Sequence, residues 1–293
     1  MIKYFGQLLK FKLSITVVFS AMIGYLLGFE YFNLYHFIYL TIGGMLVTGS
    51  ANAFNQILER KQDKLMNRTA IRPLPQKNLT ALQAFIFAGI IGVLGLFLLN
   101  KINPQGSFYG LMSKSSFFGL ISIFLYVLSY TPLKRVSTIS IFVGAIPGAI
   151  PFLLGYVAAT DDFGLAAGVL FIIQFFWQFP HYISIAWVLD EDYKKAGFKM
   201  LFGGKKNRYP ATISIITSIL MTIASVVPYF YVKNLNLSIY GFIIVLFLGV
   251  WFTLKSIKLY QNLDDYSARK VMLFSFVYLP FIQLVFVMDR FLG

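Results

Sequence analysis

The sequence from Leu34 to Pro75 reads LYHFIYLTIGGMLVTGSANAF over residues 34–54 and NQILERKQDKLMNRTAIRPLP over residues 55–75. The first part has the roughly 20 mostly apolar residues that a membrane-spanning helix needs. The second part is densely charged and carries both signs of charge. An apolar run that ends in such a segment predicts a helical membrane protein whose chemistry lies at the edge of the bilayer.

The composition of the whole chain agrees with a membrane location. Of its 293 residues, 58% are hydrophobic and only 12% are charged, whereas a soluble domain carries about 25% charged residues. A soluble protein of this size could not bury so much apolar surface in one core. The chain has no cysteine, which excludes disulfides, thiolate metal sites and cysteine nucleophiles.

Eight further apolar runs flank residues 34–54. We expect an all-α fold, because a chain in lipid must satisfy its backbone polar groups internally. The first run lacks a small-residue cleavage pattern, so we expect it to be retained as a span. The prediction is a single domain over residues 1–293 with nine spans, at about residues 13–29, 34–54, 80–99, 116–131, 138–159, 163–187, 211–231, 237–254 and 271–289.

The charged residues divide unequally between the two sides of these spans. With the N-terminus in the cytoplasm, 21 of the 25 Lys and Arg residues fall in cytoplasmic segments, and this asymmetry predicts that orientation in a cell (inner) membrane. Seven of the 11 acidic residues lie there too, so the net charge of +14 belongs to that side. Anionic lipid would attract the lysines, and we expect no nucleic-acid partner, because there is no soluble basic face.

The first charged segment places Asn55, Glu59 and Asp63 at i, i+4 and i+8, on one face of a helix. An amide and two carboxylates at the mouth of a span suit Mg²⁺, which is often held by one or two carboxylates and by substrate phosphates. Arg68 and Arg72 follow, and guanidinium groups pair well with phosphate oxygens. The alternative is a solvated helix end with ordinary charge pairs.

A second acidic cluster lies four spans later, in the stretch WQFPHYISIAWVLDEDYKKAGFKM over residues 177–200. It consists of Asp190, Glu191 and Asp192, and it would grip a diphosphate through Mg²⁺ from the other side. The alternative is a helix-end cluster paired with neighbouring lysines. His181, nine residues before Asp190, would be a haem iron ligand or a proton-handling group, or else a hydrogen-bonded packing residue.

These residues resemble the UbiA superfamily of intramembrane aromatic prenyltransferases, and within it the branch that farnesylates haem. The first family motif, N-x-x-x-D-x-x-x-D-x-x-M-x-R-T-x-x-R-P-L, falls on residues 55–74, and a W-Q-x-P-H-[FY] element with D-D-Y-x-x-A-G-x-x-M falls on residues 177–200. The likeness covers roughly residues 10–290. Glu59 and Glu191 each stand where the family has aspartate, which adds a methylene to two of the metal ligands that the resemblance implies.

The resemblance implies helices around a central cavity and a reaction of farnesyl diphosphate, haem b and water that gives haem O and diphosphate. It implies Mg²⁺ as cofactor, with Asp63 and Asp192 catalytic, and haem b as substrate, with His181 near it. Further partners would be the lipid bilayer and a terminal-oxidase assembly or haem A synthase. The remaining roles implied are metal binding by Asn55, Glu59, Asp63, Asp190, Glu191 and Asp192, diphosphate binding by Arg68, Arg72, Lys134 and Arg135, and a cavity wall of Tyr130, Trp177 and Tyr182.

Three alternatives remain at this point. A related enzyme could prenylate a quinone or chlorin ring with the same metal site. A secondary transporter of an anionic solute would favour charges near the bilayer midplane, whereas most charges here lie at the inner membrane edge. A non-catalytic assembly factor for an oxidase would not release diphosphate in the presence of Mg²⁺.

Overall fold

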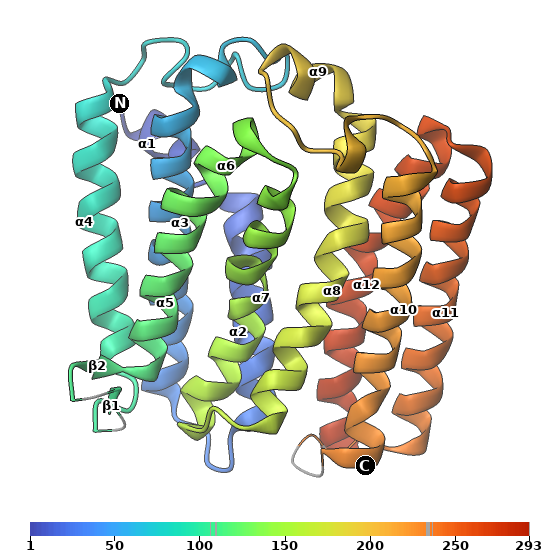
Figure 1. The fold of residues 1–293 in the computed structure, drawn as a ribbon. Coiled ribbons are helices and arrows are strands. Elements are labelled where there is room, and N and C mark those ends of the chain that lie inside the picture. The colour runs from blue at the N-terminus through green and yellow to red at the C-terminus, as the bar shows by residue number, and fades with distance from the viewer. Residues whose placement is uncertain (106, 109, 233–234, 236, 293) are drawn as a thin grey trace.

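The computed structural model describes residues 1–292 except 106, 109, 233–234 and 236. Within these residues the fold is a helical bundle (Figure 1), and nine helical segments are long and apolar enough to cross a membrane, as predicted. Their order along the chain is α1 (Ile2–Leu8), α2 (Phe11–Gly28), α3 (Leu34–Asp63), α4 (Ala81–Asn100), β1 (Ser107–Phe108), β2 (Met112–Ser113), α5 (Lys114–Phe124), a π-helical turn (Leu125–Tyr130), α6 (Thr131–Val136), α7 (Ile139–Thr160), α8 (Leu165–Val188), α9 (Asp190–Lys195), a 3₁₀ turn (Phe202–Gly204), α10 (Arg208–Tyr231), α11 (Ile239–Asn262) and α12 (Asp265–Leu292).

Several helices extend past the ends predicted from hydropathy. Helix α3 continues nine residues beyond residue 54, through the first part of the charged segment to Asp63. Hydropathy falls at Glu59 and Arg60, but the helix continues because one face of this segment stays buried against the protein. Helices α11 and α12 likewise exceed their predicted ranges of 237–254 and 271–289, α11 at its C-terminal end and α12 at both ends, where charged side chains can reach water.

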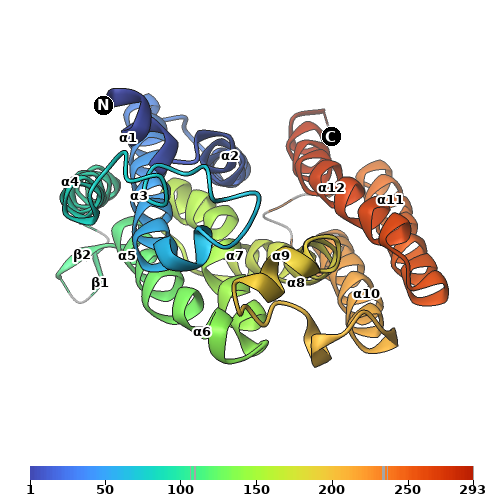
Figure 2. The ribbon, with the colours of Figure 1, turned by 90° about the horizontal axis from the view of Figure 1, so that it is seen from above.

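The two chain ends lie at opposite ends of the bundle, as an odd number of spans requires (Figure 1). Helix α9 and the α3–α4 connection lie at the same end as the N-terminus, so the two charged segments share one face of the molecule. Seen along the bundle, α2–α6 form one group and α10–α12 another, with α7 and α8 between them (Figure 2).

Helix α7 is the most buried span, and it packs closely against α2. A β-carbon added at Gly155 would lie 1.8 Å from the backbone oxygen of Ala21, and one added at Gly24 would lie 2.2 Å from the backbone oxygen of Phe152. The two backbones can therefore meet only because both positions are glycine. Small residues commonly allow such close helix contacts in membranes.

The fourth span is not a regular helix. Between α5 and α6 it widens into the π-helical turn, which carries Tyr126 and Tyr130. Such π-helical turns often occur at functional sites because they shift side chains out of the regular helical register. Here the turn directs both tyrosines into the interior of the bundle, where they line a cavity.

Candidate active site

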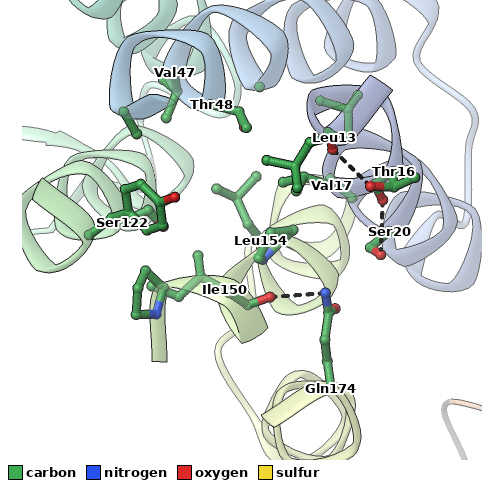
Figure 3. A pocket seen from close by; sticks show the side chains of 18 of the residues that line it. Leu13, Thr16, Val17, Ser20, Val47, Thr48, Ser122, Ile150, Leu154 and Gln174 are labelled. Carbon is green, nitrogen blue, oxygen red and sulfur yellow. Dashed lines mark hydrogen bonds between the residues drawn. The ribbon is translucent and has the colours of Figure 1, made fainter. Parts of the chain in front are cut away.

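A cavity of about 590 Å³ lies inside the bundle, a size typical of small-molecule sites. Side chains from α2, α3, α5, α7 and α8 converge on it (Figure 3), and Phe276, Leu279 and Pro280 of α12 add to its wall. Among the described residues that line it, only Lys12 is charged. The cavity is therefore suited to an apolar ligand.

The predicted aromatic wall is present at this cavity. Tyr130, Trp177 and Tyr182 all line it, as predicted, and Tyr126 joins them. The rings of Tyr130 and Tyr182 are stacked with their centroids 6.4 Å apart. Electron-rich ring faces of this kind stabilise a cation that forms nearby.

The first predicted cluster lies on one face of α3, as its spacing required. Asn55, Glu59 and Asp63 are all buried, with exposed fractions of 1%, 4% and 0%. Buried carboxylates need partners, and each has a cation from another element. Lys134 of α6 lies 2.7 Å from Glu59 Oε1, and Arg72 of the α3–α4 connection lies 2.8 Å from both carboxylate oxygens of Asp63.

Lys10, between α1 and α2, completes this cluster, although the sequence did not point to it. Its backbone is left-handed, with φ 47°, and its Nζ donates to Asn55 Oδ1 at 3.2 Å. Burial, together with the nearby charges of Arg72 and Lys134, lowers the pKa of Lys10 to about 7. An anion that entered beside it would favour its charged form.

This group, the α3 cluster, adjoins the aromatic end of the cavity. Its members are Lys10, Asn55, Glu59, Asp63, Arg72 and Lys134. Lys134 Nζ lies 4.4 Å from the centroid of the Tyr130 ring. Asn55 Nδ2 donates to Thr131 Oγ1 at 3.1 Å, and that hydroxyl donates in turn to the backbone oxygen of Tyr126 at 2.8 Å. The buried charges and the apolar cavity are thus neighbouring parts of one site.

The second predicted cluster lies on α9. Asp190 pairs with Lys194 at 2.6 Å, and Asp192 lies 3.8 Å from Lys195. Asp192 also accepts the backbone N–H groups of Asn67 and Arg68, at 3.3 and 3.4 Å, and so links the two charged segments. Glu191 is exposed and has no hydrogen-bond or ion-pair partner in the described part of the chain.

The six predicted metal ligands therefore lie in two groups. Within the described residues, no three acidic or histidine side chains converge as a ready metal site. Of the four predicted diphosphate ligands, Lys134 and Arg72 lie in the α3 cluster. Arg68 and Arg135 are exposed, and Arg135 donates to the backbone oxygen of Leu58 at 3.4 Å. Their roles stay predictions.

The model of the UbiA prenyltransferase family matches residues 17–279 of the chain. This chain belongs to the UbiA prenyltransferase family. The family resemblance of the two motifs is thereby confirmed, and the chain is a multi-pass membrane prenyltransferase.

Curated relatives of this UbiA family member are similar over nearly its whole length. A protein from Flavobacterium psychrophilum named protoheme IX farnesyltransferase is 49% identical over 98% of this chain and 94% of its own length. A protein of the same name from Flavobacterium johnsoniae is 44% identical over 98% of this chain and 94% of its own length. The human protein named mitochondrial protoheme IX farnesyltransferase is 32% identical over 96% of this chain and 60% of its own length.

Solved structures place the chain in the UbiA fold. A structure titled for digeranylgeranylglyceryl phosphate synthase matches with a TM-score of 0.81 and 21% identity, over 100% of this chain and 99% of that one. A UbiA homologue from Archaeoglobus fulgidus, described as bound to DMAPP and Mg²⁺, matches with a TM-score of 0.72 and 15% identity, over 97% of this chain and 99% of that one. At such identities the likeness extends to the fold alone.

His181 lies on α8 and lines the cavity of this UbiA family member. Its ring stacks on Trp177, with centroids 4.5 Å apart and planes 19° apart, and its Nδ1 lies 2.8 Å from Ser275 Oγ. The histidine is thus hydrogen-bonded to the protein and also lines the cavity. A role in packing and a role toward a ligand, which the sequence left as alternatives, are therefore compatible. Sequence reasoning missed Ser275, which is 94 positions away.

Proposed function

We propose that this chain transfers the farnesyl group of farnesyl diphosphate to a vinyl group of haem b, with addition of water, giving haem O and diphosphate. One observation carries this proposal: a cluster of buried carboxylates and cations adjoins an apolar, aromatic-lined cavity that contains a histidine. The acceptor is supported by the 49% identity to a protein named protoheme IX farnesyltransferase.

The diphosphate would bind at the α3 cluster. Lys10, Arg72 and Lys134 present three basic groups there against two carboxylates, and such an excess favours an anion. Diphosphate oxygens would share these cations with Glu59 and Asp63. Arg68 and Arg135, at the cytoplasmic surface, would attract the substrate to this end.

The oxygen-only donors of the two clusters fit Mg²⁺, a hard cation that takes carboxylate, amide and phosphate oxygens. The residues that would hold it are Asn55, Glu59, Asp63, Asp190, Glu191 and Asp192, with Asp63 and Asp192 the catalytic pair. When bound, Mg²⁺ supplies positive charge that stabilises the departing diphosphate. The A. fulgidus structure bound to DMAPP and Mg²⁺ supports such a cofactor for this fold.

The cavity would receive the farnesyl chain and the porphyrin. The bond between the first farnesyl carbon and the diphosphate oxygen breaks, and a new bond forms from that carbon to the terminal vinyl carbon. Tyr130, Trp177 and Tyr182 shield the allylic cation and keep bulk water away from it. Water then adds to the other vinyl carbon and loses a proton, and His181 would ligate the iron of haem b.

Orientation and domain structure extend the proposal. We infer that the end holding both charged clusters faces the cytoplasm of a cell (inner) membrane, because the excess positive charge lies there. Residues 1–293 would form one domain, since a single buried cluster reaches from Ala21 to Phe286. Contacts with a terminal-oxidase assembly or a haem A synthase stay predictions.

An Asp63→Asn variant tests the assignment of the charged cluster. Asparagine keeps the shape of the side chain but removes the negative charge, so we expect turnover of haem b and farnesyl diphosphate with Mg²⁺ to fall by about 100-fold or more. Asp265→Asn is the control, because Asp265 is exposed and its pair with Lys206 lies outside the site. Equal turnover of the two folded variants would remove Asp63 from the site.

A further inference from the structure

Ser275 lies on α12 with no exposed surface, directly opposite His181 on α8. Its hydroxyl has two neighbours within hydrogen-bond distance. It donates to the backbone oxygen of Met272 at 2.6 Å, one helical turn earlier, and it lies 2.8 Å from His181 Nδ1. These two contacts together decide where the imidazole carries its proton.

A serine hydroxyl has one hydrogen and two acceptor lone pairs, and a carbonyl oxygen can only accept. The hydrogen of Ser275 is therefore used on the Met272 oxygen. The contact with His181 then requires that Nδ1–H donates to the serine oxygen. A neutral imidazole with its proton on Nδ1 has an unshared electron pair on Nε2.

The ring of His181 is also held in orientation by its neighbours. Trp177 stacks on one face, and Phe276 meets the ring edge-on, with centroids 5.0 Å apart and planes at 86°. The indole N–H of Trp177 donates at 3.0 Å to the backbone oxygen of Ser275 itself. One residue of α12 thus fixes both the imidazole and the indole that stacks on it.

The second ring nitrogen of His181, Nε2, has no hydrogen-bond partner among the described residues, although the ring lines the 590 Å³ cavity. An imidazole held through Nδ1–H by an oxygen, with a free Nε2, is the usual arrangement of a metal-ligating histidine, in which the outer hydrogen bond fixes the tautomer.

We infer that Ser275 is a positioning residue that holds His181 with its proton on Nδ1, so that Nε2 is presented to the iron of a metalloporphyrin in the cavity. This inference rests on the proposed function and adds to it the atom that binds and the residue that directs it. Outer hydrogen-bond partners of metal-ligating histidines typically contribute 10-fold or more to metal affinity, so the loss of Ser275 has a measurable consequence.

The test uses the purified full-length chain titrated with haem b and followed by its Soret band. Ser275→Ala should weaken haem b binding by about 10-fold and lower the iron–histidine stretching frequency of the ferrous complex, because the Nδ1 hydrogen bond is lost. Ser275→Thr keeps the hydroxyl and should restore both values. Ser275→Cys keeps the volume but is a weaker acceptor, so it should lower the frequency without a cavity in the core.

Ser218→Ala is the matched control. Ser218 is a buried serine that donates one turn back to its own helix, to the Ile215 oxygen at 2.9 Å, but it lies on α10 and does not line the cavity. We expect haem b binding and the stretching frequency of this variant to equal those of the unaltered chain. The change in the unfolding temperature of Ser218→Ala then shows what the loss of a buried serine hydroxyl alone does to stability.

Two results would contradict the inference in different ways. If the unaltered chain ligates haem b through His181 and both Ser275→Ala and Ser275→Cys leave the stretching frequency unchanged, the positioning role is wrong and the proposed function stands. If the haem b complexes of the unaltered chain and of the His181→Ala variant have the same spectrum, His181 does not ligate the iron. The positioning role of Ser275 is then wrong as well.

Discussion

At the residue scale, the site is organised by buried ion pairs. Glu59 and Lys134 have side chains that are only 5% and 10% exposed, and Asp63 and Arg72 form a second such pair. Ions in such surroundings persist only with close partners. The longer side chain of Glu59, which departs from the family motif, still reaches Lys134 at 2.7 Å, so this departure preserves a buried ion pair.

A double-mutant cycle on this pair tests its role. Lys134→Met leaves Glu59 buried without a counter-charge, which should lower the free energy of unfolding by about 3 kcal/mol. Adding Glu59→Gln removes the unpaired charge and should recover most of this loss. The measurement is denaturant unfolding in detergent of Lys134→Met, Glu59→Gln and the double variant. A loss in the double variant equal to the sum of the two single losses would show that the two charges do not interact.

The residues of the site could be predicted from sequence only where the spacing is local. Asn55, Glu59 and Asp63 follow from helical periodicity, and the structure places them on one buried face as predicted. Lys10 and Ser275 could not be predicted, because their contacts with Asn55 and His181 cross 45 and 94 positions. Such contacts depend on how helices pack, which periodicity does not specify.

At the element scale, the apolar runs predicted which segments cross the membrane but not how each helix ends or bends. The predicted span 116–131 is in fact three pieces, α5, a π-helical turn and α6. Hydropathy cannot distinguish an α-helix from a π-helical turn, since both can be built from the same apolar residues. This turn nevertheless positions Tyr126 and Tyr130 at the cavity.

The contact between α2 and α7 provides an element-scale prediction. Gly155→Ala would place a methyl group 1.8 Å from the Ala21 backbone oxygen, so the two helices must separate, at a cost of about 1–3 kcal/mol. Gly168→Ala on α8 is the control, because nothing lies within 4 Å of its added carbon. The unfolding temperature in detergent should be lowered only for Gly155→Ala. Equal unfolding temperatures would contradict the close packing of the two backbones.

At the scale of the whole molecule, the charged clusters and the apolar cavity occupy neighbouring parts of the bundle. The helices enclose an apolar cavity, and the two acidic clusters, on α9 and at the C-terminal end of α3, lie at the same end of the bundle (Figure 1). A reaction that cleaves a charged diphosphate from an apolar chain needs these two environments side by side. The fold brings them together by joining the polar end of α3 to the aromatic end of the fourth span.

The orientation of the molecule can be tested directly, because the chain has no cysteine of its own. Single cysteines at Lys205, in the α9–α10 connection, and at Tyr31, in the α2–α3 connection, lie at opposite ends of the bundle and are exposed. A membrane-impermeant maleimide should label Tyr31→Cys in intact cells and Lys205→Cys only after the cells are opened. The reverse pattern would contradict the assigned orientation.

The mass of the product tests the central claim of farnesyl transfer to haem b. Membranes that contain the folded chain would be incubated with farnesyl diphosphate, Mg²⁺, haem b and a quinone-precursor aromatic acid. The products would be separated, and their masses would be determined by mass spectrometry. We expect the mass of haem b to increase by one farnesyl group and one hydroxyl group, with the aromatic acid unchanged. Unaltered haem b beside a farnesylated aromatic acid would contradict the proposed function.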